Sequence, residues 1–298
     1  MAGEEALQPL MFLLMYMLMK RRKDLNRAEE QKRREMLRRV RHRQYFLQRQ
    51  RRMLMPSEQE LEDAARLFHR RWGFPHCMGA VDSLHIAIVA PSSNAASYWN
   101  SADWLSVVLQ GVVNGLGQFW DVCAGFPGST DDAAILQNSA LWAAASEGSL
   151  SPQPPRPFMG RPLPYVLLGD EAYPLQSWLL KCYPESPELT PAQQVFNQQL
   201  SRARSVADSA LLRLKARWQC LHKRNDCSLD LVPTMILTCC ILHNVCEVHR
   251  DAFVDEWLEA VSDAKCSQPT SSVPALADDP TAEEVRSLFC DYFQQEHD

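Results

Sequence analysis

The stretch that most constrains the fold lies between residues 79 and 124, where the sequence predicts three β-strands in succession. The three runs alternate or are rich in β-branched side chains, as half-buried strands are: residues 79–89, 105–113 and 118–124. The sequence Asn114-Gly115-Leu116-Gly117 separates the last two runs and is a hairpin signal. A sheet with a hairpin in it is therefore expected.

The rest of the chain supplies a fourth strand, Tyr165–Gly169, and a set of helices. Periodicity and capping signals predict these helices at residues 58–71, 133–147, 172–181, 193–218, 231–249 and 283–295. The helix at 231–249 is apolar nearly all round, so it is expected to be buried. The proline-rich stretch Leu150–Pro164 predicts a surface connection, and Gln268–Pro280 a disordered linker. This order predicts an α/β fold in which helices flank a mixed sheet.

The helix predicted at Gln193–Trp218 carries a charged row beside its apolar face. The apolar residues recur at three- and four-residue steps, and Arg204, Asp208 and Lys215 lie four and seven residues apart along the flank of that face. Two interpretations stay open. The row is either a solvated helix edge with an i,i+4 Arg–Asp pair, or part of a site in which Asp208 faces other acidic residues.

Charge is distributed unevenly along the 298 residues, whose formal net charge is −5. Residues 20–52 contain fifteen Lys and Arg against four Asp and Glu, whereas residues 251–298 contain twelve acidic residues against Lys265 and Arg286. Such a cationic arm is typical of nucleic-acid contact or nuclear import, although a solvated helix with a partner-binding apolar end has the same composition. The predicted domains are a basic helical arm (1–55), a connecting helix (56–78), an α/β domain (79–248) and an acidic, partly disordered tail (249–298).

The ten cysteines are scattered along the chain. Glu4 and Glu5 stand where a secretory signal would be basic, and the apolar run at residues 10–19 is too short to span a bilayer. The thiols are therefore expected to be reduced and the protein intracellular. Four candidate zinc ligands lack a second ligand pair at zinc-finger spacing, so buried roles are expected for them: Cys239, Cys240, His243 and Cys246.

Three aspartates fall at positions that an α/β sheet can bring together. Asp82 is a charge inside the first apolar strand, which is costly unless it is paired or bound to metal. Asp170 follows the fourth strand at its carboxyl end, a frequent place for site residues, and Asp208 lies on the later helix. Clustered carboxylates repel unless a divalent cation neutralises them, and oxygen ligands favour Mg²⁺ or Mn²⁺. Asp131 and Asp132 stand at a helix start, where capping is the common role.

Several short blocks stand in a fixed order along the chain. They are Gly79-Ala-Val-Asp82 with His85-Ile86, Pro127-Gly128-Ser129 with Asp132, Leu168-Gly169-Asp170 with Ala172-Tyr173-Pro174-Leu175, Trp178-Leu179-Leu180, Phe196-Asn197, Leu200-Ser201, Ala203-Arg204, Leu214-Lys215, Arg217-Trp218 and Cys240-Ile241-Leu242-His243-Asn244. From about Gly79 to Glu247 the chain thereby resembles the nuclease domain of PIF/Harbinger transposases and of the nucleases derived from them.

This resemblance implies an RNase H-like fold for residues 79–248 and divalent-metal-dependent hydrolysis of DNA phosphodiester bonds. Matched position by position, the catalytic and metal-binding acids are Asp82, Asp170 and Asp208. Asp132 matches a further acidic position that supplies a metal ligand. Arg204 and Lys215 would orient the helix acid or contact a DNA phosphate, and His85 and Tyr173 would have supporting roles.

The resemblance further implies Mg²⁺ or Mn²⁺ as cofactor, DNA and a separate Myb/SANT-like DNA-binding protein as partners, and a location in the nucleus and also the cytoplasm. Departures from the family pattern favour an alternative, a domesticated and catalytically silent module that keeps the fold to bind DNA or protein. The family usually has Glu at the position of Asp208, which is one methylene shorter. Asn100 is followed by Ser101-Ala102-Asp103, where the family has two cations that favour a DNA backbone.

Overall fold

The computed structural model of the chain describes residues 56–92, 94–151, 154–262, 267–269 and 277–297. The chain divides into two units, Met1–Arg49 and Gln50–Asp298, and the described residues all belong to the second. The basic arm predicted at residues 1–55 lies outside the described residues.

Five strands form one mixed sheet in the order β3-β2-β1-β6-β7. The antiparallel strands are β1 (Cys77–Ala87), β2 (Ser106–Val113) and β3 (Phe119–Pro127), and the strands parallel to β1 are β6 (Val166–Leu168) and β7 (Leu179–Leu180). The pairing of β1 with β6 covers only Cys77–Ala80, so from Val81 to Ile86 β1 has a strand partner along one side, β2. At Ala87 the Asn225 N–H donates to the β1 carbonyl from the other side at 2.8 Å. The predicted α/β class with a mixed sheet flanked by helices is confirmed.

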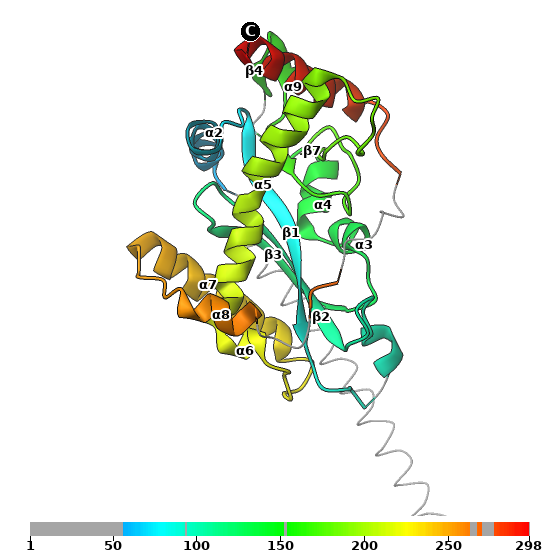
Figure 1. The fold of residues 1–298 in the computed structure, drawn as a ribbon, viewed down its shortest axis with the longest axis vertical. Helices are drawn as coiled ribbons and strands as arrows, with labels where there is room; N and C mark the ends of the chain where they lie inside the picture. The colour runs from blue at the N-terminus through cyan, green and yellow to red at the C-terminus, as the bar shows by residue number, and fades with distance from the viewer. Residues whose placement is uncertain (1–55, 93, 152–153, 263–266, 270–276, 298) are drawn as a thin grey trace, which may run out of the picture. The chain divides into compact units, whose positions relative to one another are not determined.

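Helix α5 (Pro191–Arg217) crosses one face of this sheet (Figure 1). It begins two residues before the predicted start at Gln193, with a capping box between Thr190 and Gln193 and with Pro191 in the first turn, where its missing N–H removes no bond. Its inward row alternates larger apolar residues with alanines, including Leu200, Ala203 and Ala207, all buried in the largest core cluster. Small residues there let the helix backbone approach the sheet closely, which places the flank of α5 beside β1.

The opposite face of the sheet is covered by two short helices, α3 (Asp132–Gln137) and α4 (Ala140–Ser146). A single helix was predicted at residues 133–147, and this prediction is wrong. The Ser139 side chain accepts a hydrogen bond from the Trp142 N–H and caps a second helix. A serine that can bond its own backbone competes with the helix interior and favours such a restart.

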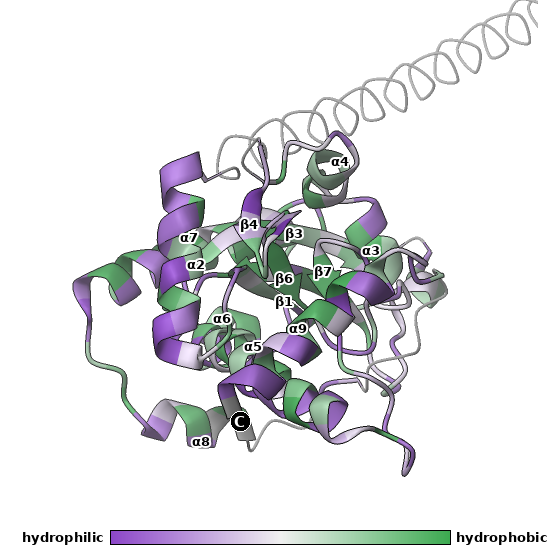
Figure 2. Cartoon of the chain, turned by 90° about the horizontal axis from the view of Figure 1, so that it is seen from above, coloured by the Kyte–Doolittle hydropathy of each residue, from purple (hydrophilic) through white to green (hydrophobic). Residues whose placement is uncertain are grey.

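The remaining elements complete the two layers. They are α2 (Glu58–Trp72), η1 (Ala95–Tyr98), the small hairpin β4 (Arg156–Phe158) and β5 (Arg161–Leu163), α6 (Gln219–His222), α8 (Glu256–Ser262) and α9 (Ala282–His297). The capping box predicted from Ser57 and Glu60 starts α2, and Gly73 ends it in the left-handed conformation at φ 72°. Seen from above, hydrophobic residues gather at β1 and β6 between helices that carry hydrophilic residues (Figure 2).

The helix predicted at residues 172–181 is also wrong, because this segment contains β7. The Leu167 N–H donates to the Trp178 carbonyl and the Gly169 N–H to the Leu180 carbonyl, which adds β7 to β6 as a parallel strand. Two residues are too few to show an alternating pattern, and Leu179 and Leu180 are both fully buried. The inward leucines therefore gave the same signal as one face of a helix.

Helix α7 (Val232–His249) packs along β3 with one side only, so the prediction of a fully buried helix is wrong. The Asn244 side chain accepts from the Phe119 N–H at 2.8 Å and donates to the Phe119 carbonyl at 2.6 Å. Pro233, at the other end of α7, lies against Gly125, where an added Cβ would be 2.7 Å from Pro233 Cγ. The outer side exposes Ile241 (42%), Val245 (47%) and Val248 (63%) among other apolar residues.

By length and composition α7 is the one helix among the described residues that could cross a membrane, a test that core helices of soluble proteins also pass. Its Cys240 and His243 are buried, and His243 Nε2 lies 3.1 Å from the Gly117 carbonyl oxygen of the β2–β3 hairpin. The motif residues of this helix therefore anchor it to the sheet.

The acidic tail is attached to the body at several places. The helix predicted at residues 283–295 is confirmed as α9, which buries Phe289 and Phe293 in the main core cluster. Parts of the stretch predicted to be disordered make defined contacts instead: Asp278 accepts from Lys181 Nζ at 2.8 Å, and Gln268 is bonded to β1. Residues 270–276 lie outside the described residues.

Candidate functional site

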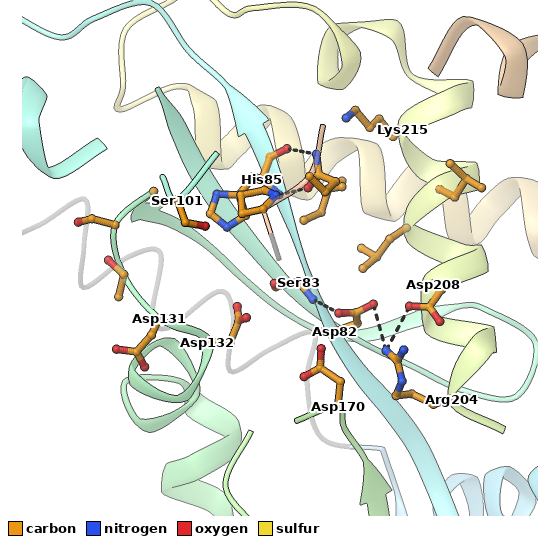
Figure 3. A pocket seen from close by; sticks show the side chains of 18 of the residues that line it. Asp82, Ser83, His85, Ser101, Asp131, Asp132, Asp170, Arg204, Asp208 and Lys215 are labelled. Carbon is orange, nitrogen blue, oxygen red and sulfur yellow. Dashed lines mark hydrogen bonds and ion pairs between the residues drawn. The ribbon is translucent and has the colours of Figure 1, made fainter. Parts of the chain in front are cut away.

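A cavity of about 450 Å³ opens where β1, α3, α5 and the end of β6 meet, and four aspartates from four separate elements line it. They are Asp82 on β1, Asp132 in the first turn of α3, Asp170 just after β6 and Asp208 on α5. Figure 3 shows Asp82, Asp170 and Asp208 grouped near Arg204, with Asp132 across the cavity from Asp208. The structure thus brings the four predicted acidic residues to one cavity.

Arg204 bridges two of these carboxylates. Its Nη1 donates to Asp208 Oδ1 at 3.1 Å and lies 3.6 Å from Asp82 Oδ2 (Figure 3). The Asp82 and Arg204 side chains are largely buried, 17% and 22% exposed, whereas Asp208 is 49% exposed. Of the two interpretations of the charged row on α5, the structure therefore favours the one in which it faces other acidic residues. Arg204 supplies the positive charge that neighbouring carboxylates require.

The electrostatics of Asp82 reflect this crowding. Burial raises its pKa well above the ordinary value, and the neighbouring Asp208 and Asp170 raise it further, while the Arg204 guanidinium opposes them. Burial also depresses the pKa of Arg204, but the Asp208, Asp82 and Asp170 carboxylates more than compensate, so that the net direction is upward. A site that disfavours its own negative charge in this way binds an added cation more readily.

Asp131 and Asp132 have different roles although they are adjacent. Asp131 is the N-cap of α3, and its Oδ1 accepts from the Ala134 N–H at 2.7 Å. Asp132 is then the first helical residue, and its side chain is turned toward the cavity (Figure 3). Burial raises the pKa of Asp132 to about 6, with Asp170 and Asp131 adding to the effect and the Ser83 side chain opposing it. The capping role expected for both residues holds for Asp131.

Lys215 lies two turns beyond Asp208 on the same helix and also lines the cavity. The wall between them is apolar and includes Leu84, Leu211 and Leu212. Lys215 is 6% exposed, so this cation of the cavity wall is almost fully buried.

His85 lines the cavity and is held by two residues behind it, Asn100 and Ser106, whose contacts the sequence did not predict. His85 Nδ1 lies 2.9 Å from Ser106 Oγ, and Asn100 Nδ2 donates to the same oxygen at 3.0 Å. Burial lowers the pKa of His85 to about 4, so the imidazole is neutral at physiological pH. Asn100 and Ser106 are 15 and 21 positions from His85 in the sequence. No local sequence pattern predicts that these residues share hydrogen bonds at the Ser106 hydroxyl.

Tyr173 is completely buried beneath the carboxylates. Burial raises its pKa well above the ordinary value, and the charges of Asp132, Asp82 and Asp170 act in the same direction. Its ring packs against Gly169, where an added Cβ would be 3.0 Å from Tyr173 Cδ2. Tyr173 therefore supports the loop that presents Asp170.

The donor set fits a hard divalent cation in chemistry, since all four acids offer carboxylate oxygens. Among the described residues, however, no group of three or more His, Cys, Asp or Glu side chains is already arranged to hold a metal ion. Arg204 occupies the position between Asp82 and Asp208. Metal binding would require the guanidinium to give up at least one of these contacts.

The chain is similar to a known protein family and to several curated proteins. Residues 81–244 match the family model described as DDE superfamily endonuclease. The chain is 32% identical over 206 residues to "Protein ALP1-like" of Arabidopsis thaliana, covering 66% of this chain and 49% of that protein. It is 33% identical over 199 residues to "Putative nuclease HARBI1" of Rattus norvegicus, covering 65% and 52%, and 32% identical over 205 residues to the Homo sapiens protein of that name, covering 67% and 53%.

The chain thus spans about half the length of the curated relatives that it matches. No solved structure matches it. All four acidic residues of the cavity lie inside the matched region, and the resemblance to the Harbinger transposase-derived proteins is borne out by the relatives. The chain belongs to the DDE superfamily endonuclease family, among the relatives of the Harbinger transposase-derived proteins.

Proposed function

We propose that this chain is a divalent-metal-dependent endonuclease that hydrolyses DNA phosphodiester bonds in the acidic cavity. The observation that carries the proposal is the convergence of Asp82, Asp132, Asp170 and Asp208 on one cavity from four separate elements. A structural role accounts for Asp131, which caps a helix. Burial raises the pKa of both Asp82 and Asp132, so burying these two carboxylates is unfavourable for folding and is better explained by a functional role.

The strand order supports an RNase H-like fold. The central strand β1 carries Asp82 in its middle. The antiparallel strand β2 joins it on one side and is followed by β3, the short parallel strands β6 and β7 lie on the other side, and Asp170 follows β6. Adjacent strands are about 5 Å apart. Residues at matching heights on β1 and β6 therefore meet, which accounts for the approach of two aspartates that are 88 positions apart in the sequence.

In this proposal Asp82, Asp170 and Asp208 hold the metal, with Asp132 as a further ligand. The cation would neutralise the carboxylates, activate a water molecule and stabilise the leaving oxygen. Arg204 orients Asp82 and Asp208 before the metal enters and is then available to contact a phosphate. Lys215, on the same wall, would add positive charge along the path of the backbone.

The names of relatives support the class of substrate. Proteins about one-third identical to this chain are named as nucleases, and the matched family is described as an endonuclease family. The basic stretch at residues 20–52 suits contact with DNA and a nuclear location. The family resemblance adds a Myb/SANT-like DNA-binding protein as the proposed partner.

A second candidate is a catalytically silent module that keeps the fold for binding. It is favoured by Arg204, which fills the place between two carboxylates, and by the short reach of Asp208, which is half exposed at the edge of the cavity. The two candidates differ in one observable, metal-dependent cleavage.

The test is nicking of supercoiled plasmid by the purified chain with Mg²⁺ or Mn²⁺. Wild type should nick, and Asp82→Asn and Asp170→Asn should each reduce the rate by at least about a hundredfold, as loss of a metal ligand does. Asp131→Asn is the matched control: it removes one negative charge from the same cavity but keeps a side chain that caps α3. Equal nicking by wild type and the Asp82 and Asp170 variants would refute the assignment and indicate a contaminating nuclease.

A further inference from the structure

A segment of the acidic tail, Ser267–Pro269, lies at the cavity that the four aspartates line. Gln268 and Pro269 form part of the cavity wall, together with Val261 at the end of α8. The segment is 183 positions away from its main contact on β1, so the contact is purely tertiary.

The contact uses backbone groups that the sheet leaves open. The His85 N–H donates to Gln268 Oε1 at 2.8 Å, and Gln268 Nε2 donates back to the His85 carbonyl at 3.2 Å (Figure 3). At this point β1 has β2 along one side, but its pairing with β6 has ended at Ala80. A side-chain amide thus takes the place of a missing strand and satisfies both groups of His85.

A second bond fixes the segment in place. Trp104 Nε1 donates to the Ser267 carbonyl at 3.0 Å, and the Trp104 ring stands edge-on to the His85 imidazole with 6.1 Å between centroids. The segment therefore has a preformed seat made of the His85 backbone and the Trp104 indole. We call this seat, with its occupant, the tail latch.

A nucleic acid strand that reached the carboxylates would meet the tail latch at the cavity wall. The latch lies three residues from Asp82 on β1, and its side chains fill part of the wall around the carboxylates. The tail in which it stands carries twelve acidic residues against two basic ones, so it repels phosphates as well as excluding them sterically.

We propose that Ser267–Pro269 is an autoinhibitory segment that narrows the substrate cavity and is displaced when nucleic acid enters. This inference rests on the proposed function, since it concerns access to the same site. The occupant is this chain's own tail, held by three hydrogen bonds that involve no charged side chain. Such a latch opens readily: loss of a few neutral hydrogen bonds shifts a closed–open equilibrium by about one to two orders of magnitude.

The test is binding of a fluorescein-labelled DNA duplex, followed by anisotropy in EDTA so that cleavage plays no part. Gln268→Ala removes both bonds to His85, and the variant should bind about tenfold more tightly than wild type. Trp104→Phe removes one donor while keeping a ring, and should tighten binding about threefold. Gln295→Ala on the exposed side of α9 and Trp99→Phe on an exposed indole are the matched controls, and should bind as wild type does.

Circular dichroism and thermal unfolding establish that each variant is folded before binding is compared. Affinities of Gln268→Ala and Trp104→Phe that equal the wild-type value would overturn the latch, as would the absence of duplex binding by every protein. Failure of the proposed function gives a different result. In that case no protein nicks plasmid with Mg²⁺ or Mn²⁺, but in EDTA Gln268→Ala and Trp104→Phe still bind the duplex more tightly than wild type does. Tighter duplex binding by Gln268→Ala and Trp104→Phe than by wild type supports the latch. If Gln268→Ala also nicks plasmid faster than wild type, the proposed function is supported as well.

Discussion

Removal of the Arg204 charge should expose how strongly the carboxylates of the cavity repel one another. Arg204→Met keeps most of the aliphatic stem, so that packing against the wall is largely preserved, but Asp82 and Asp208 lose their shared cation. Breaking a fully buried ion pair costs about 3–5 kcal/mol. Because Asp208 is half exposed and screened, we expect a loss of about 2 kcal/mol, or roughly 4–8 °C in the unfolding midpoint for a body of this size.

The pH dependence separates charge from packing in this prediction. Burial and its acidic neighbours already raise the pKa of Asp82, and loss of Arg204 removes the main opposing effect. The folded variant therefore holds a proton on Asp82 more tightly than the unfolded chain does, so its stability rises as the pH falls from 7 toward the ordinary pKa of an aspartate, about 4. The difference in the free energy of unfolding between wild type and Arg204→Met should therefore be largest near neutral pH and become smaller in acid.

Thermal unfolding monitored by circular dichroism, with and without Mg²⁺, measures both effects. With Arg204 gone, the cation should occupy the vacated position and stabilise the variant by about 2.7 kcal/mol at a hundredfold excess over the variant's Kd. Wild type, whose Arg204 holds that position, should be stabilised less at the same Mg²⁺ concentration. Arg202→Met, an exposed arginine on the same helix, is the matched control. A deficit that is independent of pH and of Mg²⁺, or equal in the two arginine variants, would refute the reasoning.

Three further outcomes follow from the structure. Asp132→Asn should raise stability at pH 7 by up to about 3 kcal/mol, because a carboxyl whose pKa lies at about 6 in the folded protein makes the protein less stable as the pH rises from about 4 through 6. Burial also raises the pKa of Asp121 to about 7, and this carboxyl does not line the cavity. Asp121→Asn should therefore gain stability in the same sense, but only Asp132→Asn should weaken stabilisation by Mg²⁺ in a thermal-shift titration. Asp208→Glu should increase the nicking rate if the shorter reach limits metal binding, and an unchanged rate would place the limit elsewhere. Val245→Asn on the outer side of α7 should change the free energy of unfolding by less than about 0.5 kcal/mol, against more than about 3 kcal/mol for the buried Ile236→Asn, and urea titrations of similar midpoint would contradict the one-sided packing of α7.

Helices and strands whose signals lie within a few neighbouring residues were predictable from the sequence. Helices α2 and α5 begin at capping boxes whose partners are three residues apart, so a reader of the sequence sees the whole device. Strands β1, β2 and β3 are long enough to show their pattern. By contrast, β7 has two residues, and the break between α3 and α4 depends on one serine, so neither leaves a periodic trace.

The sequence predicted which aspartates belong to the candidate site, but not how the neighbouring side chains are arranged around them. Asp82, Asp170 and Asp208 each stand out locally, as a charge inside a strand, an acid after a strand and an acid on a helix flank. That Asp131 caps α3 while Asp132 faces the cavity depends on a difference of one position in the helix start, which the sequence Asp-Asp does not reveal. The contacts of His85 with Ser106 and Gln268 join residues that are distant in the chain, and no spacing rule reaches them.

The way in which α7 lies along β3 also determines how this chain can associate with others. An open edge strand is a template for strand addition, but here Asn244 fills the hydrogen-bonding groups of Phe119, and Pro233 stands over Gly125. The opposite edge ends in β7, which offers only two residues. Within the described part of the chain, growth of the sheet by a second molecule is thus blocked at one edge and poorly supported at the other. Association through helical or loop surfaces is therefore favoured over fibre-like growth by strand addition at the sheet edges.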